Sequence, residues 1–152
     1  MKTKFRFFAS LLVLVAVVAP ALAGCGGGGS SSGGGSFVAG AEAACAKANE
    51  RIAALVTPGQ EQVTEYLEST EAVIERLHRE VAALDASGAA ETAYTEALAE
   101  AIPVLTEMTN AARNENLDAV RELSAGLVKI HLGEVAEAAK LKRCAEVPVS
   151  ES

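Results

Sequence analysis

From Phe37 onward, apolar side chains recur every three or four residues, the spacing at which they line one face of an α-helix. The first two of these apolar stripes are separated by Thr57-Pro58-Gly59, a sequence that favours a turn. The first stripe consists of Val38, Ala41, Cys45, Ala48, Ile52 and Leu55, and the second of Val63, Leu67, Thr70, Ile74, Leu77, Val81 and Leu84. Each stripe predicts a helix that buries one face.

Two further stripes follow after the turn signals Asp85–Gly88 and Asn114–Asn116. The third comprises Tyr94, Leu98, Ala101, Leu105, Met108 and Ala112. Pro103 lies within it and has no backbone N–H, so we expect a kink or a split there. The fourth predicted helix runs from Leu117 to about Lys142, with Asn116 as its N-cap.

The fourth helix carries two adjoining sets of side chains and two glycines. Its main face has Val120, Leu123, Leu127, Ile130 and Leu141, and the adjoining face has Val128, His131, Val135 and Ala138. Gly126 and Gly133, seven residues apart, share a face on which we expect a neighbouring helix to approach closely. Four helices joined by short breaks, with no alternation of period two, predict an all-α, up-down-up-down four-helix bundle over residues 37–147 and a short tail over 148–152.

The chain ahead of the bundle has the layout of a secretory signal peptide. Residues 1–6 form a short basic segment, residues 7–23 form an apolar segment without charge, and small residues follow. The alternative is a permanent transmembrane helix. Seventeen apolar residues reach only the lower end of the spanning range, however, and no basic cluster follows them. The signal interpretation is therefore favoured.

Leu22-Ala23-Gly24-Cys25 resembles the lipobox of bacterial lipoproteins, which consists of an aliphatic residue, two small residues and a cysteine. The resemblance implies that Cys25 receives diacylglycerol through a thioether, that a signal peptidase cuts between Gly24 and Cys25, and that Cys25 begins the mature chain. Acyl chains such as palmitate contribute about 0.8 kcal/mol per buried methylene, so two chains anchor stably. The alternative is that Cys25 is a free or disulfide-bonded cysteine.

Residues 26–36 contain only glycine and serine. Such a segment has no apolar side chains to bury and the largest backbone entropy to lose, which predicts that it stays unfolded. As a flexible coil of this length it spans roughly 17–20 Å. We therefore expect residues 1–24 to be a cleaved signal peptide and residues 25–36 to be a lipidated tether.

Composition and charge narrow the classes of partner. Half of the residues are hydrophobic but only 4% are aromatic, which suits closely packed helices better than a sheet. The formal net charge is −7, and three of the basic residues lie within the first six positions. The chain after residue 24 retains 10 basic and 20 acidic side chains. This balance opposes binding to nucleic acid or to bare anionic lipid.

The bundle topology predicts how the other two cysteines pair. With an even number of antiparallel helices, both chain ends lie at the same end of the bundle. Cys45 falls in the opening turns of the first helix and Cys144 just after the fourth. An exported chain enters an oxidising compartment, so we expect a Cys45–Cys144 disulfide that fastens the two termini at the membrane-proximal end. The alternative is a pair of buried thiols.

The chain also resembles small alanine-rich helical lipoproteins of high-GC Gram-positive bacteria. The residues that carry this resemblance are Leu22–Cys25, Cys45 with Asn49 one turn later, and Cys144, together with the Gly/Ser tether. It implies an architecture and a location on the extracytoplasmic face of the cell membrane. It carries over no catalytic residue.

The sequence gives only weak evidence for a metal or catalytic site. Glu75 and His78 match the Glu-x-x-His spacing of di-iron carboxylate bundles, but the only other histidine, His131, stands in the reverse order with Glu134. Ile74 and Leu77 take the core positions, which places Glu75 and His78 at the flank. We expect a surface position for His78 and a partly buried helical position for His131. No catalytic constellation or cofactor other than the lipid is predicted, and the chain is not expected to be an enzyme.

Two function classes remain open. The favoured one is a membrane-anchored, non-catalytic module that binds an envelope protein or ligand whose identity the sequence does not give. This class predicts that apolar residues outside the stripes, such as Val104, Leu132 and Val147, form an exposed patch. The alternative is a bundle that binds a small ligand or metal near the Pro103 kink or near His78 and His131. A passive spacer or lipid-anchored structural protein is a third possibility.

Overall fold

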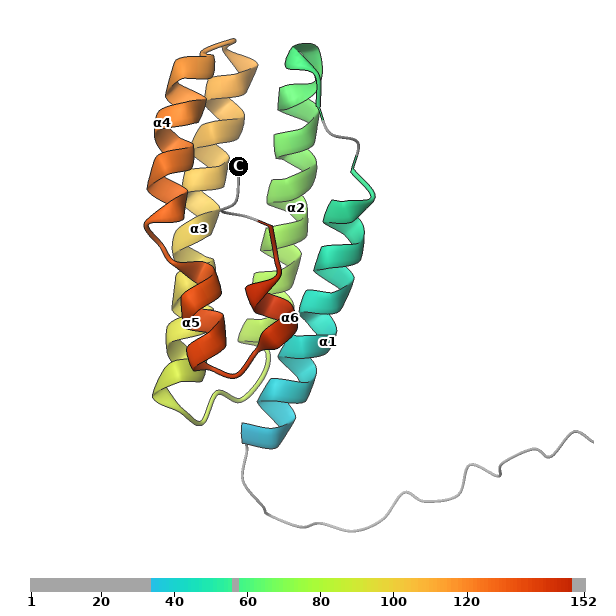
Figure 1. Ribbon diagram of the computed structural model, residues 1–152, viewed down its shortest axis with the longest axis vertical. Helices are drawn as coiled ribbons and strands as arrows, with labels where there is room; N and C mark the ends of the chain where they lie inside the picture. The colour runs from blue at the N-terminus through green and yellow to red at the C-terminus, as the bar shows by residue number, and fades with distance from the viewer. Residues whose placement is uncertain (1–33, 56–57, 149–152) are drawn as a thin grey trace, which may run out of the picture. The chain divides into compact units, whose positions relative to one another are not determined.

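The computed structural model describes residues 34–55 and 58–148, and within them it is all-α with no strand (Figure 1). One short 3-10 helix, η1, precedes the second α-helix. The elements in chain order are α1 (Gly34–Ala53), η1 (Gln60–Gln62), α2 (Val63–Ala82), α3 (Ala89–Arg113), α4 (Leu117–Val128), α5 (Leu132–Ala138) and α6 (Lys142–Ala145).

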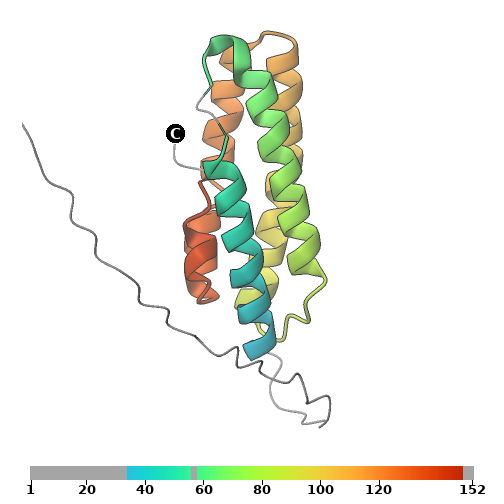
Figure 2. The ribbon, with the colours of Figure 1, turned by 90° about the vertical axis from the view of Figure 1, so that its right-hand side faces the viewer.

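The long helices pack antiparallel. α1 and α3 run in one direction and α2 and α4 in the other (Figures 1 and 2). α2 packs between α1 and α3, and α4 packs against α3. α5 continues along α3, and α6 then packs between α5 and α1. The turn between α5 and α6 lies toward the end where α1 begins, and α6 packs beside the middle of α1 (Figure 1).

The first three predicted stripes supply much of the hydrophobic core. α1 begins at Gly34, so it includes the last three residues of the predicted tether, and the buried Phe37 anchors its first turn. On α2 and α3 the interior positions of the stripes are buried, including Ile74, Leu77 and Leu98. The end positions Val63 and Leu84 are half-buried and pack on that core. The spacing argument is confirmed for these helices.

α3 is not split at Pro103. The helix runs without interruption from Ala89 to Arg113 with the proline inside it. Pro103 and Ala99, four residues earlier, are both exposed. Because the ring faces solvent, water can solvate the Ala99 carbonyl, which a residue with an N–H would otherwise have bonded. The predicted bend at Pro103 stays a prediction.

The predicted fourth helix is wrong beyond residue 128. α4 ends at Val128, and two short helices, α5 and α6, follow where one continuous helix was expected. His131 and Lys140 adopt left-handed backbone angles, with φ of 53° and 62°. Each one turns the chain and so lets the next apolar residues, Leu132 and Leu141, reach the core. Burial of these side chains outweighs the cost of a left-handed residue, about 1–2 kcal/mol.

The close helix contact expected at Gly126 and Gly133 is also wrong in part. A side chain at Gly126 would meet nothing within 4 Å, and one at Gly133 would make only an ordinary contact with the Ala145 carbonyl at 3.6 Å. The tight approach is at Gly40 instead, where an added Cβ would lie 2.8 Å from the Leu84 side chain. Because the fourth helix is broken, Gly126 belongs to α4 and Gly133 to α5, so the two do not share one helix face.

Candidate functional site

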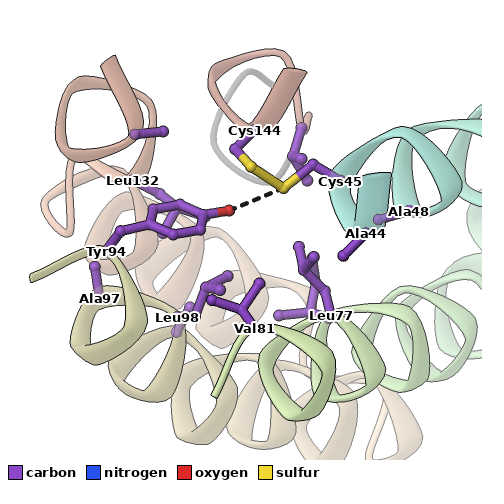
Figure 3. Close-up of a cluster of buried hydrophobic side chains, with 14 of the residues drawn as sticks. Ala44, Cys45, Ala48, Leu77, Val81, Tyr94, Ala97, Leu98, Leu132 and Cys144 are labelled. Carbon is purple, nitrogen blue, oxygen red and sulfur yellow. Dashed lines mark hydrogen bonds between the residues drawn. A yellow bond between two sulfur atoms is a disulfide. The ribbon is translucent and has the colours of Figure 1, made fainter. Parts of the chain in front are cut away.

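The Cys45–Cys144 disulfide is present and joins α1 to α6, as predicted. The two sulfur atoms lie 2.06 Å apart and the two Cα atoms 5.0 Å apart, across 99 residues of sequence. Both cysteines are fully or almost fully buried, among Ala44, Ala48, Leu77, Val81, Leu98 and Leu132 (Figure 3). The bond therefore lies within the hydrophobic core.

The position of the disulfide along α1 differs from the prediction. Cys45 is the twelfth residue of α1 and not part of its first turns, because the helix begins at Gly34. Cys144 belongs to α6, which forms after the chain has turned back at Lys140. The bond thus fastens a returning C-terminal segment to the middle of α1 and not one helix end to another.

Two polar side chains of α1 flank Cys45 on the same helix face and bind the α6 segment. The Glu42 carboxylate accepts a hydrogen bond from the backbone N–H of Arg143, with N–O distances of 3.2 and 3.3 Å. The Asn49 side-chain amide donates to the Arg143 carbonyl at 2.8 Å. Positions 42, 45 and 49 are separated by three and four residues, the spacing of one helix face. The covalent bond therefore lies between two hydrogen bonds to the same short segment.

Tyr94 of α3 adds a third element to this cluster. Its hydroxyl lies 3.3 Å from the Cys45 sulfur, and because a disulfide sulfur carries no proton, the tyrosine is the donor (Figure 3). Burial of the ring, together with the negative charge of Glu42, raises the pKa of Tyr94 well above its usual range. The phenol therefore stays protonated and neutral.

The residues of this cluster join α1, α3 and α6 to one another. A disulfide has no thiolate nucleophile, and a phenol with a raised pKa is a poor base at neutral pH. Glu42 is committed to a backbone N–H. The sequence pointed to Cys45, Asn49 and Cys144 but missed Glu42 and Tyr94. The spacing of Glu42 from Cys45 was the one signal that could have suggested Glu42.

The two histidine motifs lie on separate elements. Glu75 contacts Arg79 at 3.6 Å, and His78 is half-buried on α2. His131 is exposed and precedes α5, and its Nδ1 lies 3.3 Å from a Glu134 oxygen. The expected helical, partly buried position of His131 is wrong because its left-handed backbone ends the helix. Among residues 34–55 and 58–148, no group of three or more His, Cys, Asp or Glu side chains could hold a metal ion.

A partly buried polar contact between α2 and α3 was not predicted. The Glu71 carboxylate accepts hydrogen bonds from the hydroxyls of Thr106 and Thr109, at 2.6 and 2.8 Å. Each threonine hydroxyl also lies within hydrogen-bond distance of a carbonyl of its own helix, four residues earlier. Arg113 reaches Glu68 one turn away at 2.9 Å. These contacts set the register between the two helices.

Four open hollows lie on the described surface. Three of them have volumes of about 390, 520 and 160 Å³ and lie along α2, toward α1 or toward the end of α3. The fourth, of about 310 Å³, lies between the start of α1, the start of α3 and the turn after α5. None of these four is lined by Pro103, His78 or His131, the positions where a ligand pocket was considered.

The exposed apolar patch expected from Val104, Leu132 and Val147 is not formed. Leu132 and Val147 are only 4% and 6% exposed, and Val104 is half-buried against the core. The turns at His131 and Lys140 direct the first two inward. Val128 is the large apolar residue that is exposed within the described part of the chain.

The lipobox residues Leu22, Ala23, Gly24 and Cys25 lie outside the described residues. Among the helices that are described, none is both long enough and apolar enough to span a bilayer. No protein-family model, curated protein or solved structure matches the chain.

Proposed function

We propose that this protein is an exported lipoprotein, anchored to the outer face of a bacterial cell membrane by lipid on Cys25. In this proposal residues 1–24 are a cleaved signal peptide, and Gly24 and Cys25 flank the cleavage site. The Gly/Ser segment then separates the helical domain from the membrane. The domain itself acts as a non-catalytic module that binds another component of the cell envelope.

The observation that carries this proposal is the pairing of the cysteines. Disulfides persist in oxidising compartments, and a buried bond between Cys45 and Cys144 supports export. It also leaves Cys25 as the one cysteine of three without a partner in the chain. Cys25 follows an apolar segment and three residues that match a lipobox, so its availability for a thioether fits the same location.

A binding role is favoured over catalysis because the carboxylates described above join parts of the fold to each other. Three carboxylates hold elements of the fold in place: Glu42 accepts from α6, Glu71 accepts from α3, and Glu91 accepts from the backbone N–H groups of Ser87 and Gly88 at the start of its own helix, α3. A helical domain attached to the membrane through lipid on Cys25 suits recognition of another envelope component.

The test is Cys25→Ala in the full chain, expressed in a bacterium that processes lipoproteins. We expect the wild type to partition into the detergent-rich phase and to carry diacylglycerol on a chain that begins at Cys25. The variant should carry no diacylglycerol and should escape cleavage between Gly24 and Cys25, because the acceptor sulfur is gone. The mass of the N-terminal peptide measures both effects, because the uncleaved variant keeps the apolar segment 7–23 and need not leave the detergent-rich phase.

Ser30→Ala in the tether is the matched control and should behave as wild type. The helical content of Cys25→Ala, measured by circular dichroism, should be unchanged, since the disulfide uses the other two cysteines. If Cys25→Ala is processed as before and stays bound to the membrane, the proposal is wrong.

A further inference from the structure

Three basic side chains gather at the turn between α5 and α6. Lys140, Lys142 and Arg143, here called the basic turn, account for three of the ten Lys and Arg residues that follow Arg6. All three are exposed, and none of them forms an ion pair with another described residue. They are a local exception on a domain with twice as many acidic as basic residues.

The backbone of the segment holds these side chains outward. Leu141 and Cys144 are buried, at 0% and 1% exposure, and anchor the segment to the core. Lys140 has left-handed angles that reverse the chain, and the N–H of Arg143 is bound by Glu42. Because the two anchors point inward, the three basic side chains between and beside them must face solvent.

The basic turn lies toward the end of the bundle where α1 begins, and Lys140 is its residue closest to that end. Lys140 lines the same hollow as Val38 of α1 and Gly88, the residue that precedes α3. The chain that leads back to Cys25 joins α1 at Gly34. If Cys25 is lipidated, as proposed above and as this inference requires, only the eight residues 26–33, with a span of roughly 14–17 Å, separate it from α1 and hold this end nearest the membrane.

We infer that the basic turn contacts anionic phospholipid headgroups and so orients the tethered domain on the membrane. Each Lys or Arg close to an anionic surface strengthens binding by about fivefold, within a Debye length of about 10 Å. Glu137 and Glu146 flank the turn in sequence and are exposed, so the contact is weak and depends on salt. The net acidic charge of the domain repels other orientations, which makes the basic turn the favourable face.

The experiment uses the lipidated full chain in vesicles of phosphatidylcholine, with or without about one third phosphatidylglycerol. An amine-reactive ester labels the lysines, and mass spectrometry gives the rate at each one. We expect Lys140 and Lys142 to react about threefold or more slowly on the anionic vesicles at low salt, and the difference to vanish in 0.5 M NaCl. Lys129, which is exposed after α4, should react equally on both.

A pair of matched variants keeps Lys142 as the reporter. Lys140→Gln with Arg143→Gln should abolish the protection of Lys142. Arg51→Gln with Arg76→Gln is the matched control: it removes the same charge from two exposed side chains that form no ion pair with another described residue. This control should preserve the protection of Lys142. Equal labelling of Lys142 in wild type on the two vesicle types would overturn this inference and leave the lipid anchor standing. A chain that floats with neither vesicle type would instead defeat the proposed function and this inference with it.

Discussion

The helices α1 to α3 and the segment after α4 bury their apolar side chains in different ways. α1, α2 and α3 are 20, 20 and 25 residues long, and each buries one continuous stripe. The segment from His131 to Val147 uses helices of only seven and four residues and two left-handed turns. It reaches the core through single anchors such as Leu132, Leu141 and Cys144. The long helices are thus held in the fold by a continuous buried stripe, whereas the C-terminal segment is held by a few buried residues and by its bonds to neighbouring elements.

The largest expected effect comes from removing the covalent attachment. Cys45→Ala combined with Cys144→Ala should lower the free energy of unfolding by about 3–5 kcal/mol, because the bond closes a loop of 99 residues. Urea denaturation of the oxidised wild type and of the variant measures the loss. Each single variant should be destabilised about as much as the pair. A loss below about 1 kcal/mol would contradict the view that attachment holds the C-terminal segment.

The long helices could be predicted from the sequence, but the turns of the C-terminal segment could not. The spacing of three and four residues identified the buried positions of α2 and α3, because a sustained stripe leaves a helix one way to pack. No glycine, proline or asparagine stands at His131 or Lys140 to signal a break. Those turns are fixed by tertiary burial of the next residues, which a local pattern does not contain.

The candidate site was predictable to a similar degree. The pairing of Cys45 with Cys144 followed from the parity of the helices, even though the fourth helix is broken, since α5 still returns the chain to the end where α1 begins. Glu42 and Tyr94 were missed because their roles depend on where the α6 segment and the disulfide lie in three dimensions.

A leucine in a long core helix and one in the shorter α4 are expected to contribute differently to stability. Leu98→Ala on α3 should lower the free energy of unfolding by about 2–5 kcal/mol, since the side chain is fully buried in the core. Leu123→Ala on α4, which packs chiefly against α3, should cost about 1 kcal/mol because this leucine is only half-buried. Equal losses in chemical denaturation would mean that α4 belongs to the core as fully as α3 does.

The third prediction concerns Tyr94, which joins α3 to the disulfide. The pKa of Tyr94 is raised in the folded protein, so above the ordinary tyrosine pKa of about 10 the unfolded chain loses this proton while the folded chain keeps it. Stability should therefore be complete below pH 10 and fall by about 1 kcal/mol per pH unit above it.

Denaturation curves between pH 9 and about pH 11.5, on either side of the ordinary tyrosine pKa, measure this slope. Tyr94→Phe should remove this contribution to the fall, whereas Tyr66→Phe should keep it because Tyr94 remains. The same slope in both variants would show that ionisation of Tyr94 does not drive the alkaline loss.

The smallest expected effect tests the break between α4 and α5. Because His131 has a φ of 53°, His131→Gly should be more stable than His131→Ala by up to about 1 kcal/mol. A continuous helix would give the opposite order, with glycine about 1 kcal/mol less stable than alanine. Ala125→Gly, at an exposed position inside α4, is the helical reference and should be destabilising. Both His131 variants lack the contact with Glu134, so their difference reports the backbone.

The central claim is that one cysteine carries lipid while the other two form the disulfide. Its most direct test is the intact mass of the full-length gene product, extracted from the membranes of a lipoprotein-processing bacterium, before and after reduction. We predict the mass of residues 25–152 with diacylglycerol attached, and a gain of two hydrogen atoms on reduction. A product that retains residues 1–24 without lipid, or that gains no hydrogen on reduction, would contradict it.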